Sequence, residues 1–144
     1  MSRAMPHTNP DTSAKTNYDA FRRECPSHTV LEVLANKWAH LVICALRGET
    51  RRFGALARKI EGITPKMLTQ TLRVLERDGL VRRRMFAVIP PRVDYELTDL
   101  GEELVSLLDA ILRWSEQHVP QILGARDAFE RSRPDEEGAA RPRR

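Results

Sequence analysis

The sequence is poor in cysteine and has no long apolar run. Only two of its 144 residues are cysteines, too few for the disulfide framework that holds many small secreted domains together. No apolar run approaches the roughly 20 residues that a membrane-spanning helix needs. The N-terminal residues also lack the apolar centre of a signal peptide. These absences predict a cytoplasmic protein with no membrane partner.

The chain also lacks the patterns of catalytic and metal sites. Its four histidines show no metal-ligand spacing with each other or with cysteine. There is no glycine-rich phosphate loop and no nucleophile elbow. Asp94 and Glu96 alternate along a predicted strand and are interpreted as an ordinary solvated face, which is poor evidence for acid–base chemistry. We therefore predict a protein that is not an enzyme and that holds neither a metal nor another cofactor.

Positive charge is concentrated in the middle of the chain. Residues 51–92 contain eleven lysines and arginines against three acidic residues, a net charge of +8, whereas the whole chain carries +4. The remainder is therefore acidic on balance. A basic segment of this kind indicates contacts with nucleic-acid phosphates, although a basic solvated surface is an alternative.

A short helix, a turn and a capped helix follow one another in the basic segment. Apolar side chains at i, i+3, i+4 and i+7 predict a helix over residues 53–60. Gly62, in the turn, can adopt a left-handed conformation. Thr64 as N-cap and Pro65 at the first helical position predict a second helix over residues 65–78.

The second of these helices has two different faces. The predicted core face carries Leu68, Leu72 and Leu75. The opposite face carries Lys66, Gln70, Arg73 and Arg77, with Thr69 one step round the helix. Such side chains have the donors that read base edges and phosphates in a major groove. A solvated helix face can have the same composition, and it is the helix-turn-helix context that favours DNA.

Two strands follow, over residues 80–88 and 92–97, and predict a β-hairpin wing. Ile89-Pro90-Pro91 pairs poorly in a sheet, so these residues are placed at the hairpin tip. Arg92 beside the tip, and some of Arg82 to Arg84, could reach a phosphate or the minor groove. Strand alternation predicts that Arg83 does not share a face with Arg82 and Arg84.

Helices at both ends of this core are predicted to form a dimer. The last helix begins at Thr98-Asp99, and its apolar residues have heptad spacing. It has more apolar surface than a short winged domain needs, although a purely intramolecular core is an alternative. The predicted interface residues are Leu104, Leu107, Leu108, Ile111 and Trp114 of this helix, with Val30, Leu31 and Leu34 of the helix after Cys25. Pro120 is expected to end or kink the last helix.

The chain divides into three predicted segments. Residues 1–17 are polar and are expected to form a disordered arm. Residues 18–123 form the winged domain with its dimerisation helices. Residues 124–144 are expected to form a short helical piece and then a disordered tail.

Several of these pieces resemble the HxlR-type family of bacterial winged helix-turn-helix transcriptional regulators. The matching pieces are Cys25-Pro26, Asn36-Lys37-Trp38, Arg51-Arg52-Phe53, residues 62–83 and residues 90–101, in the right order and spacing. Asn36 stands where the family usually has glycine, at a helix junction, and asparagine tolerates a left-handed backbone. The resemblance implies a homodimer on a pseudo-palindromic operator, with one helix over residues 65–78 in each of two successive major grooves.

The leading hypothesis is a mainly α-helical winged helix-turn-helix protein that binds double-stranded DNA in the nucleoid, as a repressor. The predicted DNA-binding residues are Arg52, Thr64, Lys66, Met67, Thr69, Gln70, Arg73, Arg77, Arg84 and Arg92. The alternatives are a non-specific architectural DNA binder and a winged-helix module that binds another protein.

Cys25 is the candidate switch residue. In several relatives the cysteine before this proline senses oxidants or electrophiles, and the resemblance implies that a small molecule or a thiol reaction changes the dimer geometry. A helix N-terminus and the neighbouring Arg22 and Arg23 would stabilise a thiolate. The alternative is an unreactive thiol retained for packing. Cys44 is predicted to be buried and inert.

Overall fold

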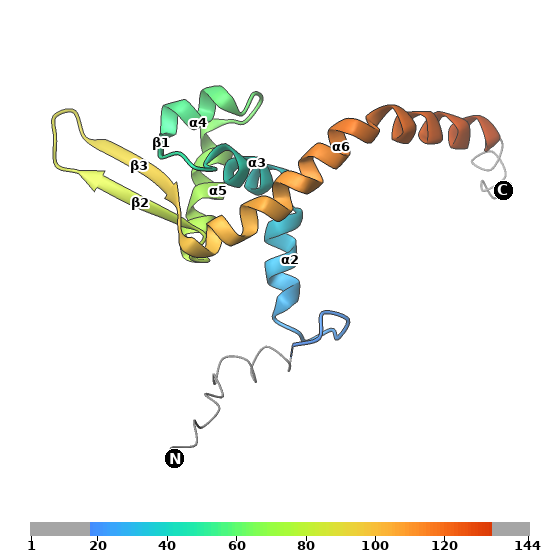
Figure 1. Ribbon diagram of the computed structural model, residues 1–144, viewed down its shortest axis with the longest axis horizontal. Helices are drawn as coiled ribbons and strands as arrows, with labels where there is room; N and C mark the ends of the chain where they lie inside the picture. Colours follow the sequence, from blue (N-terminus) through green and yellow to red (C-terminus); the bar gives the residue numbers. More distant parts are fainter. Residues whose placement is uncertain (1–17, 134–144) are drawn as a thin grey trace, which may run out of the picture. The chain divides into compact units, whose positions relative to one another are not determined.

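The computed structural model describes residues 18–133 (Figure 1). The predicted N-terminal arm and most of the predicted C-terminal tail lie outside these residues. The elements, in chain order, are α2 (Ser27–Ala35), α3 (Lys37–Ala45), β1 (Arg51–Arg52), α4 (Phe53–Lys59), α5 (Pro65–Arg77), β2 (Val81–Phe86), β3 (Arg92–Leu97) and α6 (Asp99–Ser132). The predicted fold class, a mainly helical winged helix-turn-helix, is confirmed. The chain forms two compact units, residues 1–102 and 103–144, which are described separately.

The core of the first unit is built from apolar faces at helical spacing. Its largest fully buried side chains come from α3 and its C-cap residue, and from α4, α5 and β2: Val42, Ile43, Leu46, Leu56, Leu68, Leu72, Leu75 and Val81. Helix α5 packs against α3 through its leucine face. The opposite face of α5 is thereby left to solvent, as its sequence predicts.

Side-chain caps fix where two helices begin. The hydroxyl of Thr64 accepts a hydrogen bond from the backbone N–H of Met67 at 3.1 Å, so the predicted start of α5 is confirmed. The Asn36 side-chain oxygen caps α3 by accepting from the N–H groups of Trp38 and Ala39, at 2.9 and 3.2 Å. The backbone of Asn36 is extended, with φ −72° and ψ 122°. Asparagine therefore serves this junction as a cap and not through a left-handed conformation.

The wing is a three-stranded antiparallel sheet in the order β1-β3-β2. Strand β3 has the predicted bounds, whereas β2 ends at Phe86 and not at Val88. Strand β1 was not predicted, because two residues are too few to show an alternating pattern. Its residues Arg51 and Arg52 pair with Tyr95 and Asp94 of β3. The β2–β3 hairpin extends away from α3, α4 and α5 (Figure 1).

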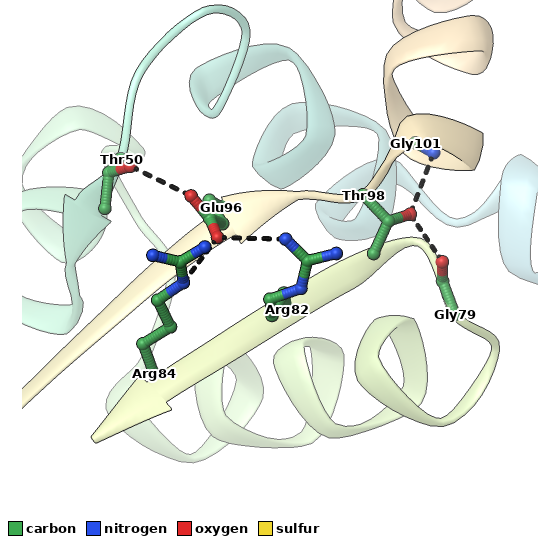
Figure 2. A network of polar contacts seen from close by, with 7 residues as sticks. All are labelled: Thr50, Gly79, Arg82, Arg84, Glu96, Thr98 and Gly101. Carbon is green, nitrogen blue, oxygen red and sulfur yellow. Dashed lines mark hydrogen bonds and ion pairs between the residues drawn. The ribbon is translucent and has the colours of Figure 1, made fainter.

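One threonine ties the base of the wing to the start of α6. The Thr98 hydroxyl donates to the carbonyl oxygen of Gly79 and accepts from the N–H of Gly101 at 3.2 Å (Figure 2). The backbone N–H of Thr98 also donates to the carbonyl oxygen of Leu80 at 3.1 Å. Gly79 makes the turn between α5 and β2 with a φ of +75°, which favours glycine. These contacts hold together the end of α5, the base of the hairpin and the first turn of α6.

Helix α6 continues through Pro120 to Ser132. Of the predicted end or kink at Pro120, the end is therefore wrong. Proline removes one backbone donor and leaves the carbonyl of Glu116 without its usual partner. Glu116 and Pro120 are both exposed, so water can satisfy that carbonyl. The segment predicted as a separate short helical piece is the continuation of α6.

Candidate DNA-binding surface

The face of α5 that is predicted to contact base edges and phosphates, called its reading face, is open to solvent. Lys66, Gln70, Arg73 and Arg77 are all exposed, and Leu68, Leu72 and Leu75 on the other side are buried. Buried leucines fix the rotation of the helix about its axis, so the polar row cannot turn inward. The result is a rigid helix that presents donor side chains at the spacing a major groove accepts.

The other candidates on α5 are less accessible. Met67 and Thr69 are partly buried, and the Thr69 hydroxyl donates to the carbonyl of Pro65 at 2.8 Å. The exposed Arg77 pairs with the adjacent Asp78 at 3.0 Å. Because surface ion pairs are weak, Arg77 can exchange this partner for a phosphate.

The wing carries a second basic group on one sheet face. Strand alternation and cross-strand pairing bring four arginines and two carboxylates onto this face. We call it the arginine face, and its residues are Arg52, Arg82, Arg84, Arg92, Asp94 and Glu96. Four guanidinium groups against two carboxylates leave the face positive. Arg83 lies on the opposite side of β2, as the alternation predicts.

The interpretation of Asp94 and Glu96 as solvated residues is wrong. The Asp94 side chain is only 7% exposed, because it lies in the central strand between Arg52 on β1 and Arg84 on β2. Glu96, at 22%, is also largely covered. A signal was available in the sequence: pairing the strands about the Pro-Pro tip sets each carboxylate opposite an arginine.

Asp94 makes a two-pronged contact with Arg92. Nε of Arg92 donates to Oδ1 of Asp94 at 3.0 Å, and Nη2 donates to Oδ2 at 2.8 Å. Nε of Arg52 lies 3.9 Å from Oδ1. The hydrogen bonds from Arg92 lower the pKa of Asp94, burial acts to raise it, and the charges of Arg92 and Arg52 lower it further. The same hydrogen bonds and charge raise the pKa of Arg92.

Glu96 is shared between the two arginines of β2 (Figure 2). Its Oε1 lies 2.7 Å from Nε of Arg84 and 3.3 Å from Nη1 of Arg82. Its other oxygen accepts from the Thr50 hydroxyl at 3.4 Å. Arg84, a predicted DNA contact, is therefore held on the sheet. Arg82, another wing arginine that could reach DNA, contacts the same carboxylate oxygen.

The predicted dimer residues differ in exposure. On α2, Val30 and Leu31 are exposed. On α6, Leu107 is 64% exposed, and Ile111 and Trp114 are also exposed. Leu34 and Leu104 are partly buried. Leu108 is only 3% exposed within the single chain, so it has almost no surface to offer a partner.

Neither cysteine is in a disulfide. Cys25 is buried beside the start of α2, with its sulfur 3.0 Å from the Ser27 hydroxyl oxygen. Cys44 is partly exposed, contrary to the prediction that it is buried.

Within residues 18–133, no cluster of three histidine, cysteine or acidic side chains is placed to hold a metal ion. The helices among these residues are too short or too polar to cross a membrane.

The chain is similar to known proteins in sequence and in fold. Residues 33–123 match the family model described as HxlR-like helix-turn-helix. The uncharacterized HTH-type transcriptional regulator YtfH of Escherichia coli (strain K12) is 43% identical over 107 residues, which are 74% of this chain and 85% of that protein. The structure of the transcriptional regulator ytfH from Salmonella typhimurium has a TM-score of 0.72 at 41% identity, over 76% of this chain and 98% of that one. The redox regulator HypR in its oxidized form has a TM-score of 0.60 at 34% identity, over 65% of this chain and 96% of that one.

Proposed function

The chain belongs to the HxlR-like helix-turn-helix family and is a transcriptional regulator with a DNA-binding fold, and from this premise we propose how it acts. It binds a pseudo-palindromic operator as a homodimer and represses transcription by occupying the promoter. One α5 helix of each protomer enters a major groove, and the two wings contact the flanking backbone. The protein works in the cytoplasm, on DNA of the nucleoid.

One observation carries this proposal. Helix α5 is capped by Thr64, held by three buried leucines and exposed along Lys66, Gln70 and Arg73. A winged-helix module that binds protein has no need of such a row. An architectural DNA binder needs the charge but not base-reading side chains in one line, because it reads phosphates and DNA shape.

The experiment that tests it is enrichment of bound duplexes from a random DNA pool, with reduced full-length protein at near-physiological salt. We expect an inverted repeat with half-sites about one helical turn apart. Retained DNA without a consensus would favour the architectural reading. No retained DNA would count against DNA recognition by the reduced, effector-free protein.

The proposed switch is Cys25. The similarity to a protein named as a redox regulator supports it, as does the position of the thiol beside the start of α2, an element of the proposed dimer. Oxidation or alkylation of a buried thiol forces its surroundings to move, and a moved α2 changes the spacing of the two reading helices. A small electrophile is the corresponding effector.

Its test is operator binding before and after diamide or a quinone. We expect binding by the wild type to change and binding by Cys25→Ser to stay constant. Cys44→Ser is the matched control and should respond like the wild type. A response that survives in Cys25→Ser places the sensor elsewhere.

A further inference from the structure

We propose that Asp94 is a positioning residue for DNA binding: its buried carboxylate holds Arg92, and at longer range Arg52, with their free edges toward a DNA phosphate. The inference rests on the proposed function, since it assigns a role within the wing's contact with DNA. It also means that the negative charge of Asp94 favours DNA binding, although DNA is itself a polyanion.

The contact between Asp94 and Arg92 leaves part of the guanidinium free. An arginine has five N–H donors in a fixed plane, and Asp94 engages donors on Nε and Nη2. The donors of Nη1 point away from the carboxylate, and the Arg92 side chain remains 43% exposed. Arg92 can therefore bind a phosphate without releasing Asp94.

A second contact restricts Arg92 further. The guanidinium carbon lies 5.0 Å from the centre of the Phe86 ring, and Phe86 is the cross-strand partner of Arg92. The Asp94 carboxylate on one edge of the guanidinium and the Phe86 ring near its plane restrict the rotamers of Arg92 before DNA binds. Preorganisation of this kind reduces the entropy lost on binding.

The two arginines face a common hollow. An open hollow of about 500 Å³ lies between the wing tip and the start of α4. It is lined by Arg52, Phe53, Gly54 and residues 88–93, which include Arg92. Its lining residues include no acidic side chain. Asp94 contacts both arginines but is not among the residues that line the hollow, so its carboxylate can orient them without facing the incoming phosphate.

Glu96 provides the matched comparison. It carries the same charge on the same sheet face, two residues along β3, but it divides its contacts between Arg82 and Arg84 and does not line the hollow. Glu96→Gln removes one negative charge from the arginine face and leaves the pair of Asp94 and Arg92 intact.

The test measures the Kd of full-length variants for the enriched duplex, and for a mixed-sequence duplex, across a range of salt concentrations. Simple removal of negative charge predicts tighter binding for both Asp94→Asn and Glu96→Gln. Positioning predicts that Asp94→Asn binds about 3- to 10-fold more weakly to both duplexes, with a salt slope reduced by about one. Glu96→Gln should bind as tightly as the wild type or more tightly, because Arg82 and Arg84 both contact Oε1 of Glu96 and the amide oxygen of glutamine can replace that single acceptor.

A double variant separates positioning from a general loss of structure. If Asp94 acts chiefly through Arg92, adding Asp94→Asn to Arg92→Ala should weaken binding much less than Asp94→Asn does in the wild type, and the remainder is the longer-range contact with Arg52. Arg92→Lys keeps the charge but cannot make the two-pronged contact, so it should bind as weakly as Asp94→Asn. It also tests the proposal should Asp94→Asn fail to fold.

Three results would overturn the inference: Asp94→Asn binding at least as tightly as the wild type, an equal loss in the Arg92→Ala background, or Arg92→Lys matching the wild type. Each of these results is compatible with DNA binding by the wild type, so the proposed function would stand. A wild type that binds neither duplex would remove the proposed function first, and this inference with it.

Discussion

Arg73 combines a permanent charge with a planar set of donors at the middle of the exposed row of α5. Unlike Arg77, it has no ion-pair partner within residues 18–133. Arg73→Ala should therefore weaken operator binding by about 1–3 kcal/mol and relax the preference at one base pair. Competition binding with operator variants measures both effects. Arg131→Ala removes the same charge from the end of α6 and should leave base preference intact; equal affinity of Arg73→Ala and wild type would remove Arg73 from recognition.

The pair of Asp94 and Arg92 also predicts a pH dependence of stability. Hydrogen bonds from Arg92 lower the pKa of Asp94 in the folded state, whereas in the unfolded chain it is about 3.9. The stabilisation is therefore complete above that value and is lost as the pH falls through the lower folded-state pKa. Urea unfolding of the wild type and Asp94→Asn from pH 3 to 7 should show a constant difference above about pH 5 that shrinks below about pH 4. A difference independent of pH would show that the charge of Asp94 is not what stabilises the wing.

Individual residues were predictable where local rules decide them. Thr64 and the exposed row of α5 follow from capping chemistry and helical spacing, which involve neighbours along the chain. The burial of Asp94 does not, because it depends on strands β1 and β2 on either side of β3. Alternation correctly placed Asp94 opposite the apolar face of β3, but it could not show that arginines cover it.

At the scale of elements, the junction between the wing and α6 requires a residue without a side chain, Gly101. A Cβ added to Gly101 would lie 2.2 Å from the carbonyl oxygen of Leu80 and 3.1 Å from a methyl group of Leu97. That carbonyl already accepts from the N–H of Thr98, so it cannot move without loosening the junction. Gly101→Ala should lower the free energy of unfolding by about 1–3 kcal/mol, despite the better helix propensity of alanine.

Gly124 is the matched control for this prediction, because it lies in the same helix with nothing within 4 Å of an added Cβ. Gly124→Ala should raise stability by about 0.5–1 kcal/mol through helix propensity alone. Thermal melting followed by circular dichroism measures both variants. A Gly101→Ala protein as stable as Gly124→Ala would show that the junction accommodates the added methyl group without loss of stability.

Elements were predictable from sequence in proportion to their local signals. Helix α5 has a cap, a proline at its first position and a leucine face, and its observed end differs by one residue from the prediction. Strand β1 has two residues and exists only because β3 lies beside it. Helix α6 passes Pro120 because its exposed backbone can bind water there, a condition that the residue type alone does not reveal.

For the whole molecule, the exposed apolar residues are evidence for a partner. Val30 and Leu31 on α2, and Leu107, Ile111 and Trp114 on α6, are each more than half exposed in the single chain. Exposed apolar side chains grouped along a helix are typical of an interface, and the heptad spacing of the α6 residues is that of helices that pack on one another. The proposed homodimer would cover these side chains and would set two α5 helices at a fixed separation, as an inverted repeat requires.

Leu107→Glu tests the proposed dimer at the most exposed position of the heptad row of apolar residues on α6, here called the seam. A carboxylate buried without a partner costs about 3–5 kcal/mol, so the dimer should dissociate at least about a hundredfold more readily. Sedimentation velocity should then show monomers, and operator binding should weaken because one protomer can hold only a half-site. Ser106→Glu places the same charge on an exposed α6 position about a third of a turn from the seam, and it should sediment as the wild type does. If Leu107→Glu remains a dimer, the α6 seam is not the interface, and the spacing of the reading helices must be set by other surfaces.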